Sequence, residues 1–233
     1  MSATPQTSPE KQILTILQLD TSFPRIPGDV ACPETYSRTV RVQKIPNASV
    51  ARIVNENPDQ FDISSFEAVC AAITQGVAAS SCGFLGYWQK HLAACCPRPF
   101  ISSALIDLPL WQQNYDNDEI AIVTFDADIL GTPLYQPLLA GFSGQLIGLK
   151  PEMHLSQVIR ENRAELDIQR AETELVELLS PAISGEKIKA LVLECTNLPP
   201  YKRAIKSACD VEIYDILTSI DARVPQLVKP EFL

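Results

Sequence analysis

The sequence lacks a long apolar run and lacks any cluster of basic residues. No hydrophobic stretch approaches the roughly 18 residues that a membrane-spanning helix needs, so no membrane partner is expected. The 19 Lys and Arg residues are outnumbered by 28 Asp and Glu residues, which gives a net charge of -9. Nucleic acid and anionic membrane surfaces are therefore poor partners on electrostatic grounds. A small anionic substrate is still compatible with this charge, because a local site can oppose the overall field.

Familiar signatures of cofactor and metal chemistry are missing as well. The sequence contains neither a phosphate-binding loop nor a dinucleotide-binding fingerprint. It has no Cys-x-x-Cys pair and no Cys/His cluster at zinc-site spacing, and His91 and His154 are far apart. The string GFSGQ at 141–145 fails the nucleophile-elbow pattern, because Gln145 stands where glycine is needed. We therefore expect no metal and no cofactor, and surface roles for the two histidines.

The amino-terminal residues and the cysteines indicate where the protein resides. The string MSATPQTSPEKQ is polar and lacks the apolar core of a secretion signal, so residues 1–10 are expected to form a disordered tail. The seven cysteines are an odd number, and a chain of 233 residues does not need disulfides to fold. We therefore expect a cytoplasmic protein whose thiols are mostly packed in the core.

Apolar runs of strand length alternate with segments of helical periodicity. Strands are predicted at 13–19, 39–45, 77–80, 119–125, 145–149, 188–194 and 211–216. Helices are predicted at 64–76, 84–96, 133–140, 155–179, 200–209 and 217–224. Strands that are apolar on both faces predict mainly parallel sheets flanked by helices, which is an α/β fold. Ligands of such folds bind beyond the carboxyl ends of the strands.

The segment 155–179 is predicted to be one long amphipathic helix. Its apolar residues recur at helical spacing, and Glu161, Glu165, Arg170 and Glu174 occupy the opposite face. A solvated exterior is the simplest interpretation of that charged face. A helix that pairs two subunits would show the same pattern, so a homodimer stays open.

Two cysteines occupy equivalent places in the predicted fold. Cys82 lies in SSCGFL and Cys195 lies in LECTNL, and both strings read Cys-x-x-Leu where a strand gives way to a helix. A packed thiol is the commoner role for a cysteine at such a position. The repeated arrangement nevertheless suggests two related lobes that each contribute one thiol.

These motifs resemble those of the cofactor-independent aspartate/glutamate racemase superfamily. Members have a Ser/Thr-rich strand that ends in Cys, as in SSCGF, and a later Cys-Thr-x-Leu element similar to ECTNLP. LQLDTSFPRIPGDV and VTFDADIL resemble an uncharacterised branch of the superfamily. The resemblance implies two pseudo-symmetric α/β lobes with the active site in the cleft between them. It places residues 11–105 and 214–233 in lobe 1, to which the last strand and helix return, and residues 106–213 in lobe 2.

The resemblance implies a racemase or epimerase that acts at the α-carbon of an amino acid or related carboxylate. Racemisation removes a proton from one face of the carbon and restores one on the other, so it needs two opposed acid/base groups. Cys82 and Cys195 are the expected pair. A helix amino terminus lowers the pKa of a thiol from about 8.5, which would allow a thiolate near neutral pH.

The remaining candidate residues would hold the substrate. Backbone amides at the two strand-to-helix turns would bind its carboxylate. Gly83 leaves room for that carboxylate, and Ser81, Thr196 and Asn197 add hydroxyl and amide donors. Asp20, which follows the first strand, is the candidate acceptor for a substrate ammonium, although it could equally cap a turn. Arg25 is the candidate partner for a side-chain carboxylate.

Several other functions are compatible with the same motifs. Hydantoin racemases, arylmalonate decarboxylases and maleate cis-trans isomerases resemble this superfamily. A decarboxylase needs only one thiol as proton donor, so the presence of two mildly disfavours it. CGF and CTN also replace the neighbours seen in aspartate and glutamate racemases, which weakens the expectation of an acidic substrate. A ligand-binding relative without catalysis is an alternative of another class.

Overall fold

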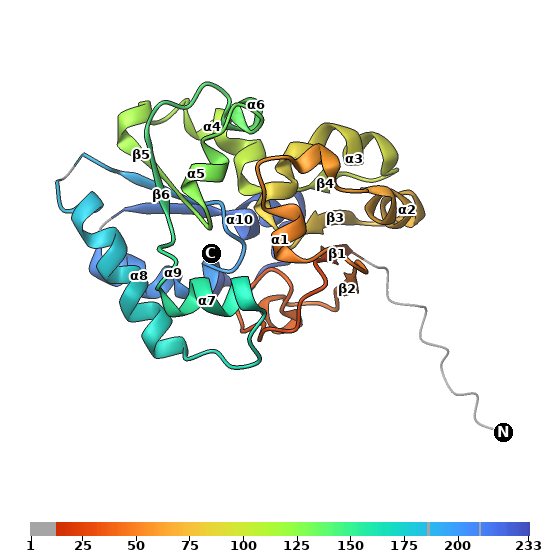
Figure 1. Ribbon diagram of the computed structural model, residues 1–233, viewed down its shortest axis with the longest axis horizontal. Coiled ribbons are helices and arrows are strands. Elements are labelled where there is room, and N and C mark those ends of the chain that lie inside the picture. Colours follow the sequence, from red (N-terminus) through yellow and green to blue (C-terminus); the bar gives the residue numbers. More distant parts are fainter. Residues whose placement is uncertain (1–12, 186, 210) are drawn as a thin grey trace.

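Two parallel sheets of four strands each organise the chain (Figure 1). The computed structural model describes residues 13–185, 187–209 and 211–233, so the tail predicted over residues 1–10 lies outside the described residues. The first sheet has the order β2-β1-β3-β4 and the second has the order β6-β5-β7-β8. Each sheet therefore repeats one topology, in which the second strand of the set lies at one edge. The predicted α/β fold with two related halves is confirmed.

The strands form where the sequence is apolar on both faces. Their bounds are β1 Leu14–Gln18, β2 Arg41–Lys44, β3 Val77–Ser80, β4 Phe100–Ile101, β5 Ile120–Thr124, β6 Gln145–Gly148, β7 Ala190–Leu193 and β8 Glu212–Asp215. The central strands β1, β3, β5 and β7 are almost wholly buried, as expected of a parallel sheet covered on both sides. β4 was not predicted, because two residues are too few to show a periodicity.

Helices and short turns of 3-10 helix connect the strands. The helices are α1 Val50–Ile53, α2 Ser64–Ala72, α3 Gln89–Cys95, α4 Leu108–Trp111, α5 Ala127–Leu130, α6 Gln136–Leu139, α7 His154–Glu161, α8 Ile168–Ile183, α9 Lys202–Ala208 and α10 Ile216–Arg223. The 3-10 turns are η1 Pro33–Thr35, η2 Pro58–Gln60, η3 Gly83–Trp88, η4 Ala104–Asp107, η5 Asn117–Glu119, η6 Pro199–Tyr201 and η7 Pro230–Phe232. α2 and α3 lie beside the first sheet, and α8 and α9 lie beside the second (Figure 1).

The prediction of one helix over 155–179 is wrong, because two helices occupy that region. α7 ends at Asn162, which adopts the left-handed conformation with φ 53°. Asparagine tolerates that conformation better than most residues do. Asp167 then begins α8 by accepting a hydrogen bond from the backbone N–H of Arg170 at 3.0 Å. The apolar periodicity runs through both helices, so it could not reveal the break.

The end of the chain passes from the second sheet to the first. β8 pairs with β7, so the expectation that the last strand returns to lobe 1 is wrong, and the boundary at residue 214 falls inside β8. α10 does return, since Ile216 and Ile220 belong to the same apolar cluster as Ile16 of β1. Asp215 begins α10 and forms a buried ion pair of 2.7 Å with Lys202. The strand pattern alone could not say which sheet β8 would join.

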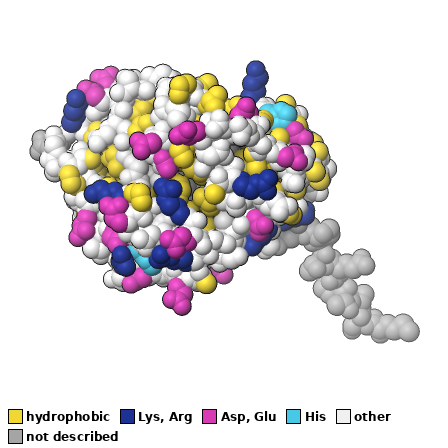
Figure 2. Space-filling view, viewed as in Figure 1, with side chains coloured by type: hydrophobic (Ala, Val, Ile, Leu, Met, Phe, Trp, Pro, Cys, Tyr) yellow, Lys and Arg dark blue, Asp and Glu magenta, His cyan; other side chains and the backbone are white. Residues whose placement is uncertain are grey.

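The surface carries charges of both signs. Figure 2 shows acidic and basic side chains interspersed over the face drawn. Among the described residues, no helix has the length and apolar character needed to cross a membrane.

Candidate active site

A cavity lies where the carboxyl ends of the central strands meet, and its walls enclose about 340 Å³ of empty space, part of which is open to solvent. It is lined by Leu19, Phe23, Arg25, Val50, Val54, Ser81, Cys82, Gly83, Phe84, Phe125, Ile159, Glu194, Cys195, Thr196 and Asn197. Leu19, Ser81, Phe125 and Glu194 directly follow β1, β3, β5 and β7, which is where parallel sheets bind ligands.

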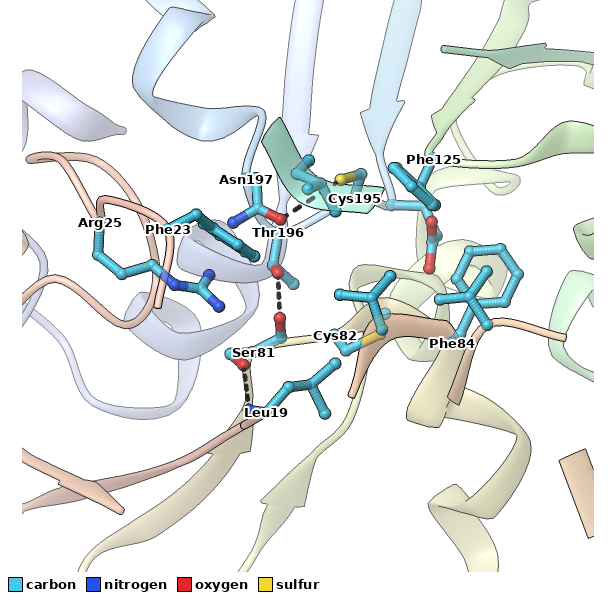
Figure 3. A pocket seen from close by; sticks show the side chains of 15 residues that line it. Leu19, Phe23, Arg25, Ser81, Cys82, Phe84, Phe125, Cys195, Thr196 and Asn197 are labelled. Atoms are coloured by element: carbon cyan, nitrogen blue, oxygen red, sulfur yellow. Dashed lines mark hydrogen bonds between the residues drawn. The ribbon is translucent and has the colours of Figure 1, made fainter. Parts of the chain in front are cut away.

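Both predicted thiols line this cavity. Cys82 and Cys195 each lie two residues beyond the last residue of a strand, β3 for the first and β7 for the second. The two residues are 8% and 6% exposed. In Figure 3 their side chains enter the space from opposite walls. The fold therefore brings together two cysteines that are far apart in the sequence.

The electrostatic environment of the thiols differs from the sequence expectation. Burial, followed by the charge of Glu194, raises the pKa of Cys82 to about 12, although the backbone amides of Phe84 and Leu85 lower it. The same two causes raise the pKa of Cys195 well above its ordinary value, against a lowering by the Asn197 amide. The expected lowering by helix-start amides is present but is outweighed by the loss of hydration. Burial and Glu194 thus oppose the expected lowering of the thiol pKa, and the thiolate near neutral pH stays a prediction.

Glu194 is the main residue that the sequence reasoning missed. Its side chain is fully buried, and its Oε2 accepts a hydrogen bond of 2.6 Å from Thr124 Oγ1. Its Oε1 has no hydrogen-bond partner among the described residues. Burial raises the pKa of Glu194 to about 7. A signal was present, since a carboxylate directly after the apolar run ALVL is unusual.

Gly83 makes room for this carboxyl group. A methyl group at position 83 would collide with Oε1 of Glu194 and with the Glu194 backbone carbonyl. Gly83 was predicted to admit the substrate carboxylate. It does line the cavity, but the group that comes closest to it is the side chain of Glu194.

The polar residues Ser81 and Thr196 join the two halves of the molecule. Thr196 Oγ1 donates a hydrogen bond of 2.6 Å to the Ser81 carbonyl, and Ser81 Oγ accepts one of 3.0 Å from the Leu19 amide (Figure 3). Asn197 Nδ2 donates a bond of 2.7 Å to Asp29 Oδ2, while the Cys195 thiol faces Asn197 Oδ1 at 3.9 Å. All three predicted residues line the cavity, and their role in binding a substrate stays a prediction.

Arg25 extends from the loop after β1 into the cavity wall. Its guanidinium pairs with Asp29 at 3.1 Å, donates to Thr21 Oγ1 at 3.0 Å and lies 4.3 Å from the centre of the Phe23 ring. Within the described chain, Arg25 Nε has no hydrogen-bond partner. The loop is anchored by Asn162 Oδ1, which accepts a bond from the Phe23 amide at 3.2 Å. Arg25 thus offers a fixed positive charge with a donor to spare.

Asp20 does not join the other candidates. Its residue is exposed, it does not line the cavity, and its Oδ2 accepts a hydrogen bond of 3.1 Å from the Asn47 amide. The predicted ammonium acceptor is therefore absent from that position. The carboxylate instead holds the loop that follows β2.

Three potential metal ligands gather elsewhere. Glu67 on α2 and His91 and Cys95 on α3 place their ligand atoms within 4.8 Å of one another. The Glu67 and His91 side chains are already paired at 2.5 Å. These atom types suit zinc, but none of the three residues lines the cavity. The sequence spacing could not reveal the cluster, because Glu67 comes from a different helix.

The chain is similar in sequence to curated proteins that are named lyases. Dimethylsulfoniopropionate lyase 6 of Emiliania huxleyi (strain CCMP1516) is 26% identical over 237 residues, covering 94% of this chain and 61% of that protein. The dimethylsulfoniopropionate lyase of Durusdinium sp. clade D is 24% identical over 226 residues, covering 89% of this chain and 72% of that protein. The chain thus spans about three fifths of the length of the Emiliania protein. No protein-family model matches the sequence.

The chain is similar in fold to solved structures of racemases. Allantoin racemase from Pseudomonas fluorescens superposes with a TM-score of 0.60 at 13% identity, covering 93% of this chain and 94% of that one. Glutamate racemase from Bacillus anthracis superposes with a TM-score of 0.55 at 16% identity, covering 94% of this chain and 84% of that one. At such identities the likeness concerns the fold, and the predicted resemblance is confirmed at that level. The chain therefore has the two-lobed α/β fold of the aspartate/glutamate racemases.

Proposed function

We propose that this chain is a lyase, which removes a proton from the carbon next to a carboxylate and expels a leaving group from the following carbon. The substrate class is that of dimethylsulfoniopropionate, and the products would be dimethyl sulfide and acrylate. The observation that carries the proposal is the pair of thiols facing one small cavity beside Arg25. The similarity to dimethylsulfoniopropionate lyases along most of the chain supports it.

Arg25 is the proposed partner of the substrate carboxylate. Removal of the α-proton moves negative charge onto that carboxylate, so a cation fixed beside it stabilises the transition state more than the ground state. The Phe84 and Leu85 amides and Arg25 also stabilise the ionised form of Cys82. The same groups would therefore assist both the base and the developing enolate.

The elimination balances without any further reactant. A thiolate takes the α-proton, the electron pair of the broken C–H bond forms the double bond, and the bond between the β-carbon and sulfur breaks. Dimethyl sulfide leaves with the electron pair of that bond and is neutral, so it needs no proton. The thiol then returns its proton to water. A thiol with a raised pKa ionises less readily but is a stronger base once ionised, which suits a weakly acidic C–H.

Racemisation of an amino acid is the second candidate. Two thiols on opposite walls match the need for two opposed acid/base groups, and proteins of this fold include racemases. The position of Asp20 disfavours it, because an ammonium group requires acceptors for three N–H groups, Asp20 lies outside the cavity, and Glu194 Oε1 would serve only part of that need. The lyase is therefore the function that the site supports best.

Incubation of the protein with dimethylsulfoniopropionate in heavy water tests the proposal. We expect dimethyl sulfide in the headspace by gas chromatography and acrylate by proton NMR. L- and D-amino acids and hydantoins are tested in parallel. Exchange at the α-carbon of one of these with the carbon skeleton retained, and no dimethyl sulfide from dimethylsulfoniopropionate, would replace the lyase by a racemase. Binding of these compounds without exchange or cleavage would instead indicate a ligand-binding relative.

A further inference from the structure

The free oxygen of Glu194 marks a part of the cavity that the proton-transfer scheme does not use. A fully buried carboxyl group with one unpaired oxygen is costly to fold, because that oxygen loses its hydration without gaining a partner. Thr124 bonds Oε2, whereas Oε1 is buried against Gly83 without a hydrogen-bond partner in the described chain, and the residue lines the cavity. The simplest reason for such a group to be present is that a bound ligand offsets the cost of its unpaired oxygen.

We propose that Glu194, together with the rings of Phe84 and Phe125, forms a subsite for a cation that carries no N–H group, such as a sulfonium or a quaternary ammonium. The inference rests on the proposed function, which assigns the reaction to the carbon next to the substrate carboxylate. It adds the residue that selects the charge of the leaving group.

The chemistry of the walls favours such an onium over an ordinary ammonium. An ammonium needs hydrogen-bond acceptors for three N–H groups, and Glu194 Oε1 would serve only part of that need. Two other acceptors are engaged, the Ser81 carbonyl by Thr196 and Asn197 Oδ1 by the Cys195 thiol. An onium group spreads its charge over methyl groups and packs against aromatic faces without hydrogen bonds. The aliphatic side chains of Val50 and Val54 complete an apolar lining around that charge.

The two aromatic rings are fixed in place by their own neighbours. The Phe84 ring packs edge-to-face with Tyr135 at 5.3 Å between ring centres. The Phe125 ring has the Arg160 guanidinium 4.6 Å from its centre, and Arg160 in turn pairs with Asp126 at 3.2 Å. Since a cation already occupies one face of Phe125, Phe84 is the ring expected to contribute more to onium binding.

The order of groups along the cavity matches a zwitterion of this class. In Figure 3 the two thiols lie between Arg25 on one side and the rings of Phe84 and Phe125 on the other. Glu194 lines the same cavity, its carboxyl group lies against Gly83, which precedes Phe84, and the Phe125 backbone lowers its pKa. A substrate with its carboxylate at Arg25 and its cation at Glu194 would present the carbons between them to the thiols.

The same arrangement lets the substrate activate its own base. The charged groups that act on Cys82 are Glu194, which raises the pKa of the thiol, and Arg25, which lowers it. An onium at the subsite neutralises the effect of Glu194 and adds a positive charge of its own. The pKa of Cys82 should then fall, so a substrate of the same shape without the onium charge would bind to a site with a less acidic thiol.

Binding of two matched probes tests the subsite without any turnover. The probes are 3-(trimethylammonio)propionate and its carbon isostere 4,4-dimethylpentanoate, in which an uncharged tert-butyl group replaces the cation, measured by isothermal titration calorimetry at pH 7.5. We expect the wild-type protein to bind the onium more tightly by about tenfold or more, a factor that corresponds to about 1.4 kcal/mol. Glu194→Gln should lose most of this preference while its affinity for the isostere stays unchanged.

Control variants separate recognition from folding. Glu194→Asp keeps the charge and should keep most of the preference, and Glu161→Gln, at an exposed position outside the cavity, should behave as wild type. Thermal melting followed by circular dichroism establishes that each variant is folded. If Glu194→Gln does not fold, the titrations of Glu194→Asp and of the wild-type protein still test the subsite. Equal affinity of the wild-type protein for both probes overturns it.

The outcomes also separate this inference from the proposed lyase activity. An onium preference that depends on Glu194, without release of dimethyl sulfide, would keep the subsite and overturn the lyase. Release of dimethyl sulfide together with an unchanged onium preference in Glu194→Gln would keep the lyase and overturn the subsite.

Discussion

The two halves of the molecule reach the cavity by the same backbone route but place different side chains on it. In each half one residue separates the end of a central strand from the cysteine, Ser81 before Cys82 and Glu194 before Cys195. The Ser81 amide donates to the Leu17 carbonyl at 3.0 Å, and the Glu194 amide donates to Val123 at 2.8 Å. Each bond reaches the first strand of its own sheet, so the two turns are equivalent.

The side chains at these equivalent positions have different consequences. The Ser81 hydroxyl is neutral and accepts from the Leu19 amide, whereas Glu194 brings a carboxyl group that burial holds near a pKa of about 7. Glu194 raises the pKa of both thiols, whereas Arg25 lowers only that of Cys82 and Asp29 raises only that of Cys195. Symmetry of the fold therefore places the thiols, and the charged groups around them make the two unequal.

Removing the thiols one at a time should have the largest effect and tests whether the two halves contribute equally to the reaction. Elimination needs one base, so Cys82→Ser and Cys195→Ser should be unequally impaired, the worse by at least ~100-fold in the rate of dimethyl sulfide release and the other by less than ~10-fold. Racemisation would need both thiols and would lose comparable activity in both variants. Cys209→Ser, at a half-buried position outside the cavity, should stay near the wild-type rate.

The charge of Glu194 should be visible in the pH dependence of stability. Its pKa is raised from 4.5 to about 7 in the folded protein, so between these values the folded state holds more protons than the unfolded state. Wild-type stability should therefore fall as pH rises from 5 to 8, relative to Glu194→Gln, by up to ~3 kcal/mol. Urea unfolding of both proteins at the two pH values measures this difference. An identical pH dependence in the two proteins would mean that Glu194 is not a perturbed acid.

Gly83, in the half that holds Cys82, tests how closely the Glu194 carboxyl group is packed. Gly83→Ala should place a methyl group against the Glu194 carboxyl and lower the unfolding free energy by ~2 kcal/mol, the usual scale for an overpacked interior. Gly185→Ala is the matched control, because a methyl group there meets nothing within 4 Å. Urea unfolding at pH 7 compares the two variants. Equal stability of both would show that the carboxyl group moves aside at little cost.

What the sequence could predict depended on local signals. The central strands are contiguous apolar runs, and Cys82 and Cys195 follow two of them, so both the α/β fold and the paired thiols were accessible. β4 has two residues, and the break after Asn162 depends on one left-handed residue, so neither leaves a periodic pattern. These elements are set by tertiary packing more than by their own sequence.

The charge of the site depended on contacts between distant segments. The state of Glu194 follows from Thr124 on β5 and from Gly83 after β3, and neither is near it in the sequence. Asp20 was assigned to the cavity because it follows a central strand, but its carboxylate turns to the Asn47 amide. Position at a strand end can thus predict which backbone reaches the site, whereas the direction of each side chain follows from its partners.

The hydrogen bond between the halves should give the smallest effect. Thr196→Val removes the bond from Thr196 Oγ1 to the Ser81 carbonyl and leaves a buried acceptor unsatisfied, so the unfolding free energy should fall by ~1 kcal/mol. Thr173→Val, on the exposed side of α8, is the control and should change stability less. Because the bond joins the segment after β3 to the segment after β7, its loss should also loosen the pairing of the two thiols. Crosslinking of Cys82 to Cys195 with a short bifunctional thiol reagent should then be slower in Thr196→Val than in Thr173→Val. Equal crosslinking rates would show that packing, and not this bond, fixes the distance between the two halves.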